Sequence, residues 1–156
     1  MSKAFTKDQN DSSSEALTPP QGPDLPAGAK NYMTPQGAAQ LREELKRLLQ
    51  IPAAQQKDAP RIQYLRTRLS ELEIINPQEQ ITAEVRFGAT VRIQDENGNK
   101  RTVQLVGVDE ANPTQGLISW ISPLARALAG AKAGETIVLE LPNRSEEFEI
   151  LEIRYA

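Results

Sequence analysis

The sequence of 156 residues contains no cysteine and no histidine. Without cysteine no disulfide can form, and without either residue type the usual protein ligands of zinc are missing. The same absence excludes Ser-His-Asp and Cys-His nucleophilic catalysis. A bound metal would have to be held by oxygen atoms, which favours Mg²⁺ or Ca²⁺. Because no nucleophile–base pair or ligand cluster is visible, we expect a protein that is not an enzyme and needs no cofactor or metal.

Aromatic residues are few, and a strong excess of charge of one sign is also missing. Aromatics make up 4% of the chain and hydrophobic residues 38%, so the core must be built mainly from Leu, Ile, Val and Ala. The formal net charge of −3 provides no global basic field that would attract nucleic acid or a membrane. No apolar run approaches the roughly 18 residues that span a bilayer, and the N-terminus lacks the apolar centre of a signal peptide. We therefore expect a soluble, cytoplasmic protein with no membrane partner.

The composition and the hydrophobic pattern divide the chain into three parts, residues 1–30, 31–78 and 79–156. The first part is polar and rich in serine and proline, and it cannot bury enough apolar surface to offset its ordering entropy, so a disordered tail is predicted. The second part carries two apolar seams with spacings of 3, 4 and 3, formed by Ala38, Leu41, Leu45 and Leu48 and by Ile62, Leu65, Leu69 and Leu72. Two heptad seams of equal length predict an antiparallel helical hairpin, a short coiled coil with arms of roughly 24 Å at 1.5 Å per residue.

The ends of both predicted helices have local signals. Thr34 is a good N-cap and Pro35 fits the first position of the first helix. Asp58 can cap the second helix, which is predicted to end near Ile75. The segment IPAAQQKDAP (51–60) between them is predicted to be a turn.

From Ile81 onward the hydrophobic period changes to two, which is typical of strands. One segment, SPLARALAGA (122–131), instead predicts a short helix with Ser122 as cap and Pro123 at its first position. The predicted strands are EVRFGATVRI (84–93), TVQLVGV (102–108), GLISWI (116–121), ETIVLEL (135–141) and EEFEILEIRY (146–155). Residues 79–156 are therefore expected to form a twisted antiparallel sheet with one helix packed on it, which makes the whole chain α+β.

Five segments of the chain are distinctive as motifs. They are ISWISPLARALAGAKAGE (118–135), FGATV (87–91), VGVDEAN (106–112), YMTPQGAAQLREEL (32–45) and MSKAF (1–5). With these motifs the chain resembles the bacterial Gre transcript-cleavage factors, in particular their GreB branch. The resemblance implies an FK506-binding-protein-like (FKBP-like) C-terminal domain that docks on RNA polymerase at the rim of its secondary channel. It implies the partner-binding residues Asp109, Glu110, Ser122, Pro123, Leu124, Ala125 and Arg126. The protein is then expected to work as a monomer with RNA polymerase as its partner.

The chain departs from the family at the tip of the predicted hairpin. In the family, two acidic residues at this tip help to hold a second Mg²⁺ near the polymerase active site, where backtracked RNA is hydrolysed. Between Leu49 and Ile62 this chain has twelve residues, among which Asp58 is the only acid and is well placed as a plain helix cap. Arms that are shorter by a dozen residues withdraw the tip by roughly 20 Å. A Gre-class elongation regulator that stimulates RNA cleavage weakly or not at all is therefore expected.

Other interpretations remain open on the sequence. The bases of the hairpin could make a weak contact with nucleic acid within the polymerase complex, or they could form a solvated face interleaved with acids. They are Arg42, Lys46, Arg47, Arg61, Arg66 and Arg68. The short hairpin also resembles the "regulator of nucleoside diphosphate kinase" branch, and a generic protein-interaction module is a further alternative. Trp120 and Phe148 could line a ligand pocket, although core packing is favoured for large aromatics in strands.

Overall fold

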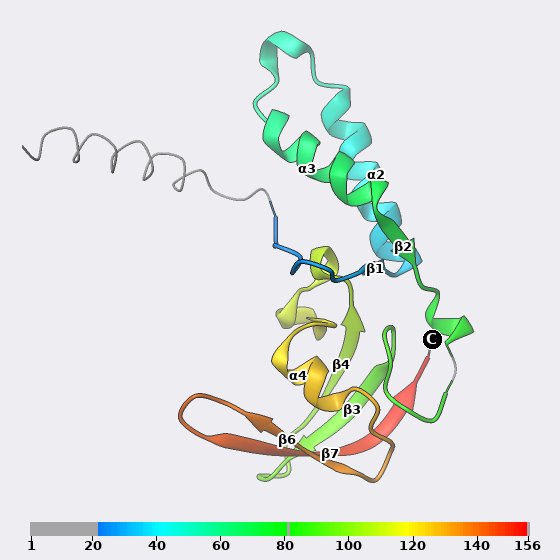
Figure 1. Cartoon of the computed structure of the whole chain (residues 1–156), viewed down its shortest axis with the longest axis vertical. Coiled ribbons are helices and arrows are strands. Elements are labelled where there is room, and N and C mark those ends of the chain that lie inside the picture. Colours follow the sequence, from blue (N-terminus) through cyan, green and yellow to red (C-terminus); the bar gives the residue numbers. More distant parts are fainter. Residues whose placement is uncertain (1–21, 81, 156) are drawn as a thin grey trace, which may run out of the picture.

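The computed structural model describes residues 22–80 and 82–155, which form a mixed α+β protein (Figure 1). Two helices project from one end of a curled sheet, and one further helix packs on that sheet. Most of the tail predicted to be disordered, residues 1–21, lies outside the described residues. Within the described part of the chain, no helix is long and apolar enough to cross a membrane.

The first long helix, α2 (Pro35–Leu49), begins where its capping residues predicted. Thr34 is the N-cap, and its hydroxyl accepts a hydrogen bond of 3.2 Å from the backbone N–H of Gly37. A short 3₁₀ turn, η1 (Ala53–Gln55), follows before α3 (Ala59–Ser70) runs back alongside α2 (Figure 1). We call α2, α3 and their connection the helical pair. Its buried centre consists of Met33, Ala38, Leu41 and Leu65.

The end of α3 differs from the prediction. The helix stops at Ser70 rather than near Ile75, and β2 (Leu72–Ile74) pairs in parallel with β1 (Asn31–Met33). The backbone N–H of Ile75 donates to the carbonyl of Met33 at 2.9 Å, and the Asn31 amide donates to the carbonyl of Arg68 at 2.7 Å. Hydrogen bonds with β1 thus replace those of a last helical turn. The spacing of Leu72 from Leu69 fits a helix and gives no sign of this pairing, which depends on tertiary structure.

The predicted capping role of Asp58 is also wrong. Asp58 occupies the N-cap position of α3, but its side chain makes no capping hydrogen bond. Its φ of −109° and ψ of 25° lie outside the extended region that N-caps adopt, and its N–H donates to the side chain of Gln56 at 2.9 Å. The first turn of α3 therefore lacks a side-chain cap.

Five strands form the sheet in the spatial order β5-β4-β3-β7-β6. They are β3 (Thr90–Asp95), β4 (Lys100–Val106), β5 (Leu117–Ser119), β6 (Thr136–Glu140) and β7 (Ser145–Arg154). The prediction of an entirely antiparallel sheet is wrong at one edge, because β5 pairs in parallel with β4. Two 3₁₀ turns, η3 (Val108–Glu110) and η4 (Pro113–Gln115), carry the chain back before β5 starts.

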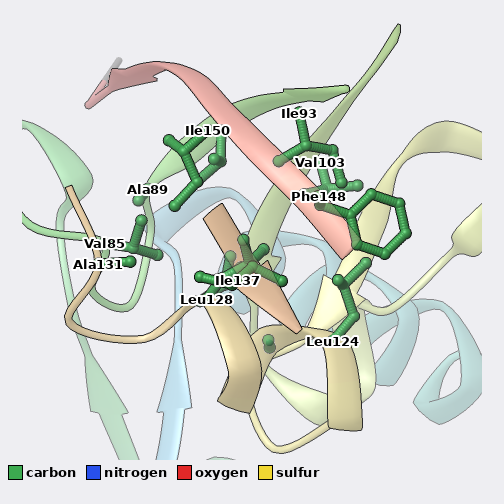
Figure 2. Packing of buried hydrophobic residues seen from close by; sticks show 13 residues of the cluster. Val85, Ala89, Ile93, Val103, Leu124, Leu128, Ala131, Ile137, Phe148 and Ile150 are labelled. Atoms are coloured by element: carbon green, nitrogen blue, oxygen red, sulfur yellow. The ribbon is translucent and has the colours of Figure 1, made fainter. Parts of the chain in front are cut away.

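The main core lies between the sheet and α4 (Pro123–Leu128), which directs Leu124 and Leu128 inward (Figure 2). Its other buried members are Val85, Ala89, Val91, Ile93, Val103, Leu105, Ala125, Ala131, Ile137, Phe148 and Ile150. The predicted strand 84–93 begins only at Thr90, because Gly88 adopts a φ of +88° and turns the chain. Phe148 is buried in this core, which confirms the packing interpretation for that residue.

Candidate docking site and its junction with the helical pair

The start of α4 carries five of the residues that the family resemblance marks as partner-binding. Ser122 is the N-cap, and its hydroxyl accepts a hydrogen bond of 3.3 Å from the N–H of Ala125, as predicted. Pro123 and Arg126 are exposed, whereas Leu124 and Ala125 are buried in the core. The buried pair anchors the helix, so the accessible part of this site consists of Pro123, Arg126 and the half-buried Ser122.

The Arg126 guanidinium makes no hydrogen bond or ion pair with any other residue that the structure describes. An exposed arginine beside a rigid proline offers a charged donor fork on a well-ordered helix start. This arrangement suits recognition of a carboxylate or a backbone carbonyl on a protein partner.

Glu110, the second acid of the VGVDEAN motif, is turned toward the helical pair. Its carboxylate accepts hydrogen bonds from the backbone N–H of Thr34 at 2.9 Å and of Gly107 at 2.8 Å, and it also accepts one from the Thr34 hydroxyl. An acid at this place satisfies orphan donors and complements the positive end of the α2 dipole. Glu110 therefore ties the C-terminal sheet domain to the first turn of α2.

Asp109 makes a second tie, to α3. Its side chain is only 2% exposed, and the Nε of Arg68 lies 3.5 Å from its Oδ2 atom. The Tyr64 hydroxyl donates to the other carboxylate oxygen. Burial, reinforced by this hydrogen bond to Asp109, raises the pKa of Tyr64 to about 12, so the phenol remains protonated and can donate at neutral pH. The Arg68 guanidinium also lies over the Tyr64 ring, 5.0 Å from its centroid.

The family resemblance marks Asp109 and Glu110 as partner-binding, whereas the structure shows both acids engaged within the chain. Their partners Thr34, Tyr64 and Arg68 lie 76, 45 and 41 residues away along the sequence. No local pattern signals such contacts.

An aromatic cluster joins the same junction to the docking helix. The ring of Tyr32 in β1 lies 5.6 Å from that of Phe87 and 5.1 Å from that of Trp120. The rings of Phe87 and Trp120 pack edge to face at 6.4 Å. Because Trp120 is two residues before Ser122, β1 packs directly against the segment that leads into α4. The tryptophan considered as a pocket residue thus contributes to interdomain packing.

The tip of the helical pair is apolar rather than acidic. Leu49 and Ile51 are 50% and 37% exposed, and Asp58 is exposed as well. Below the tip, Arg61 bridges the two helices through paired hydrogen bonds of 2.7 and 2.9 Å to Glu44, and this contact lowers the pKa of Glu44. Among the residues that the structure describes, no three acidic side chains are grouped closely enough to hold a metal ion.

Comparison with known proteins identifies the family. Residues 80–155 match the family model described as "Transcription elongation factor, GreA/GreB, C-term". The chain is 37% identical over 154 residues to a transcription elongation factor GreB of Neisseria meningitidis serogroup B, with 81% of this chain and 94% of that protein covered. It is 35% identical over 157 residues to a transcription elongation factor GreA of Alkalilimnicola ehrlichii, with 82% of this chain and 99% of that protein covered.

Among solved structures, the chain is similar to a prokaryotic transcription elongation factor GreA/GreB from Nitrosomonas europaea. That match has a TM-score of 0.42 and 24% sequence identity, and it covers 81% of this chain and 100% of the other. Because this superposition is loose, the assignment rests on the sequence matches, which extend over nearly the full length of both relatives. The chain belongs to the GreA/GreB family of transcription elongation factors.

Proposed function

We propose that this protein binds RNA polymerase in the bacterial cytoplasm and regulates transcription elongation as a monomer. Residues 79–156 would form the docking domain, with the FKBP-like fold that the family resemblance implies. Residues 31–78, which contain the helical pair, would enter the secondary channel as a short coiled coil. The observation that carries this proposal is the surface formed by the exposed Pro123 and Arg126 and the half-buried Ser122 on α4, within the region matched by the family model.

Within this assembly the tip would stimulate RNA cleavage weakly or not at all. Two-metal hydrolysis needs carboxylates that hold a hard cation close to the attacking water. The tip offers one exposed carboxylate, Asp58, and its exposed large apolar side chains are Leu49 and Ile51. Such a tip can occupy a channel and exclude other factors, but it provides a poor site for Mg²⁺.

A second candidate is a channel-competing regulator of the "regulator of nucleoside diphosphate kinase" type. The short connection between α2 and α3 favours it, because a compact pair of helices reaches less deeply than a long coiled coil. Both candidates share the docking surface and differ in what the tip does after docking.

Binding is tested by measuring the affinity for bacterial RNA polymerase of a double variant, Pro123→Ala with Arg126→Ala. We expect at least about tenfold weaker binding, since removal of an exposed arginine anchor at an interface commonly costs more than 1 kcal/mol. Pro142→Ala with Arg144→Ala is a matched control, because it removes the same residue types from the exposed β6–β7 turn. Unchanged binding of the α4 variant would show that this surface is wrong, and absence of binding by the unaltered protein would overturn the proposal.

The role of the tip is tested on stalled, backtracked elongation complexes. We expect the protein to add little RNA cleavage compared with a Gre factor that carries two acids at its tip, and Asp58→Ala should change nothing. Strong cleavage that Asp58→Ala abolishes would contradict our interpretation of the tip. Competition against the cleaving factor in the same assay distinguishes occupation of the channel from failure to bind.

A further inference from the structure

The segment before β1, residues 22–30, lies between α3 and the C-terminal domain. Figure 1 shows it as the blue tube that passes below the helical pair and leads into β1. Its first residue, Gly22, approaches α3 so closely that a Cβ atom there would lie 2.3 Å from the Cζ of Tyr64. A turn follows, in which the N–H of Ala29 donates to the carbonyl of Pro26 at 3.0 Å. The segment is thus held against α3 at its start and shaped by its own turn before it enters β1.

The Pro23 carbonyl is the central contact of this segment. It accepts a hydrogen bond from the Arg68 guanidinium, and it lies 2.9 Å from the Tyr64 hydroxyl, whose single proton it shares with Asp109. The same two side chains hold Asp109 of the C-terminal domain. We call these four residues the junction node: Pro23 from the N-terminal segment, Tyr64 and Arg68 from α3, and Asp109 from η3.

The segment is also fixed at its other end. Lys30 forms an exposed ion pair of 3.3 Å with Glu73, and the buried amide of Asn31 donates to the Arg68 carbonyl. Arg68 is therefore bound by its backbone to β1 and by its side chain to both Pro23 and Asp109. Two prolines, Pro23 and Pro26, reduce the conformational freedom that the segment loses when it is held in this way.

We propose that residues 22–30 form a strap that fixes the direction of the helical pair relative to the C-terminal domain. The strap supplies the neutral acceptor that keeps Tyr64 and Arg68 oriented toward Asp109 and covers them from water. Without it, the Arg68–Asp109 pair would face solvent, where an ion pair contributes little and its geometry is loose. The Glu110 cap on α2 and the packing of Tyr32 on Phe87 and Trp120 would remain, and the helical pair would then swing more freely about these contacts.

The strap is a feature of the free protein, so its test does not depend on polymerase binding. Where the proposed function holds, the strap determines the direction in which the apolar tip points from the docked domain. Failure of the polymerase assay would leave the strap intact, and failure of the strap would leave docking intact.

The absence of cysteine allows the test to be made with two introduced thiols. Gln55→Cys at the tip and Glu140→Cys on β6 are both at exposed positions, and spin labels on them report the tip-to-domain distance by pulsed electron paramagnetic resonance. We expect a narrow distance distribution in the full chain and in a variant without residues 1–20, which keeps the strap. In a variant without residues 1–29, the width should at least double.

Tyr64→Phe provides a second and milder variant, because it removes the donor to Pro23 and Asp109 but keeps the ring. We expect it to broaden the distribution as well, whereas Ser70→Ala, which removes an exposed hydroxyl from the same helix, should not. If deletion of residues 1–29 prevents folding, as judged by circular dichroism, the Tyr64→Phe result decides. Equal widths in the full chain and in the folded variants, or a broad distribution in the full chain itself, would overturn the strap.

Discussion

Replacing Asp109 by alanine is expected to destabilise the protein by about 3 kcal/mol, because removal of one partner leaves the other charge of a buried pair uncompensated. The Asp109 side chain is 2% exposed and that of Arg68 is 11% exposed, so the abandoned guanidinium has little access to water. The Tyr64 hydroxyl loses an acceptor at the same time. The loss should appear in urea denaturation as a lower midpoint with a similar slope.

An exposed ion pair on the sheet offers the matched control. Glu152 lies 3.2 Å from Arg154, with both side chains at least half exposed. Glu152→Ala should cost less than about 1 kcal/mol, since solvent screens such pairs. A loss of similar size for Asp109→Ala and Glu152→Ala would mean that the junction node is open to water, contrary to its burial here.

Replacing Gly107 by alanine is expected to cost about 3 kcal/mol, at the upper end of typical overpacking effects. A Cβ atom at this position would lie 2.3 Å from the backbone oxygen of Tyr32 and 3.3 Å from the Cα of Met33. Both obstacles are main-chain atoms of β1, so no rotation of a side chain relieves the clash. Gly107 has a φ of −68°, which alanine adopts freely, so the expected loss of stability comes from the steric clash alone.

The result can be followed by urea denaturation and by the fluorescence of the one tryptophan in the sequence. As β1 is pushed away, the ring of Tyr32 leaves Trp120, and the emission should shift to the red. Gly134→Ala provides the contrast, because Gly134 has a φ of +90° and open space around it, so only strain of roughly 1 kcal/mol is expected. A Gly107→Ala variant with unchanged stability and emission would show that β1 does not pack on η3 in solution.

Helix starts were predictable because their determinants lie within three residues of one another. The Thr34–Gly37 and Ser122–Ala125 hydrogen bonds each join a cap to the N–H three positions later, with proline directly after the cap. The family membership was predictable for a related reason, since each motif that carries the resemblance is a short contiguous segment of the sequence. Asp58 shows the limit of such local reasoning, because its backbone angles rather than its residue type decide that it does not cap α3.

The candidate site was predictable only in part. Pro123 and Arg126 are exposed on α4, in the place where the motif led us to expect a contact surface. The directions of Asp109 and Glu110 were not predictable, because an acid in a loop carries no sign of whether it faces a partner or another part of its own chain. Burial of Leu124 and Ala125 followed from the packing of α4 on the sheet rather than from the motif itself.

By itself, the sequence determined the capped starts of α2 and α4, the absence of cysteine and histidine chemistry, the family, and the lack of paired acids at the tip. Only the tertiary structure decided that β2 replaces a helical turn, that β5 runs parallel to β4, and that Asp109 meets Arg68 and Tyr64. The physical reason is range. Caps and turns are satisfied by neighbouring backbone groups, whereas strand pairing and buried ion pairs depend on residues that lie tens of positions away and meet only after the core has formed.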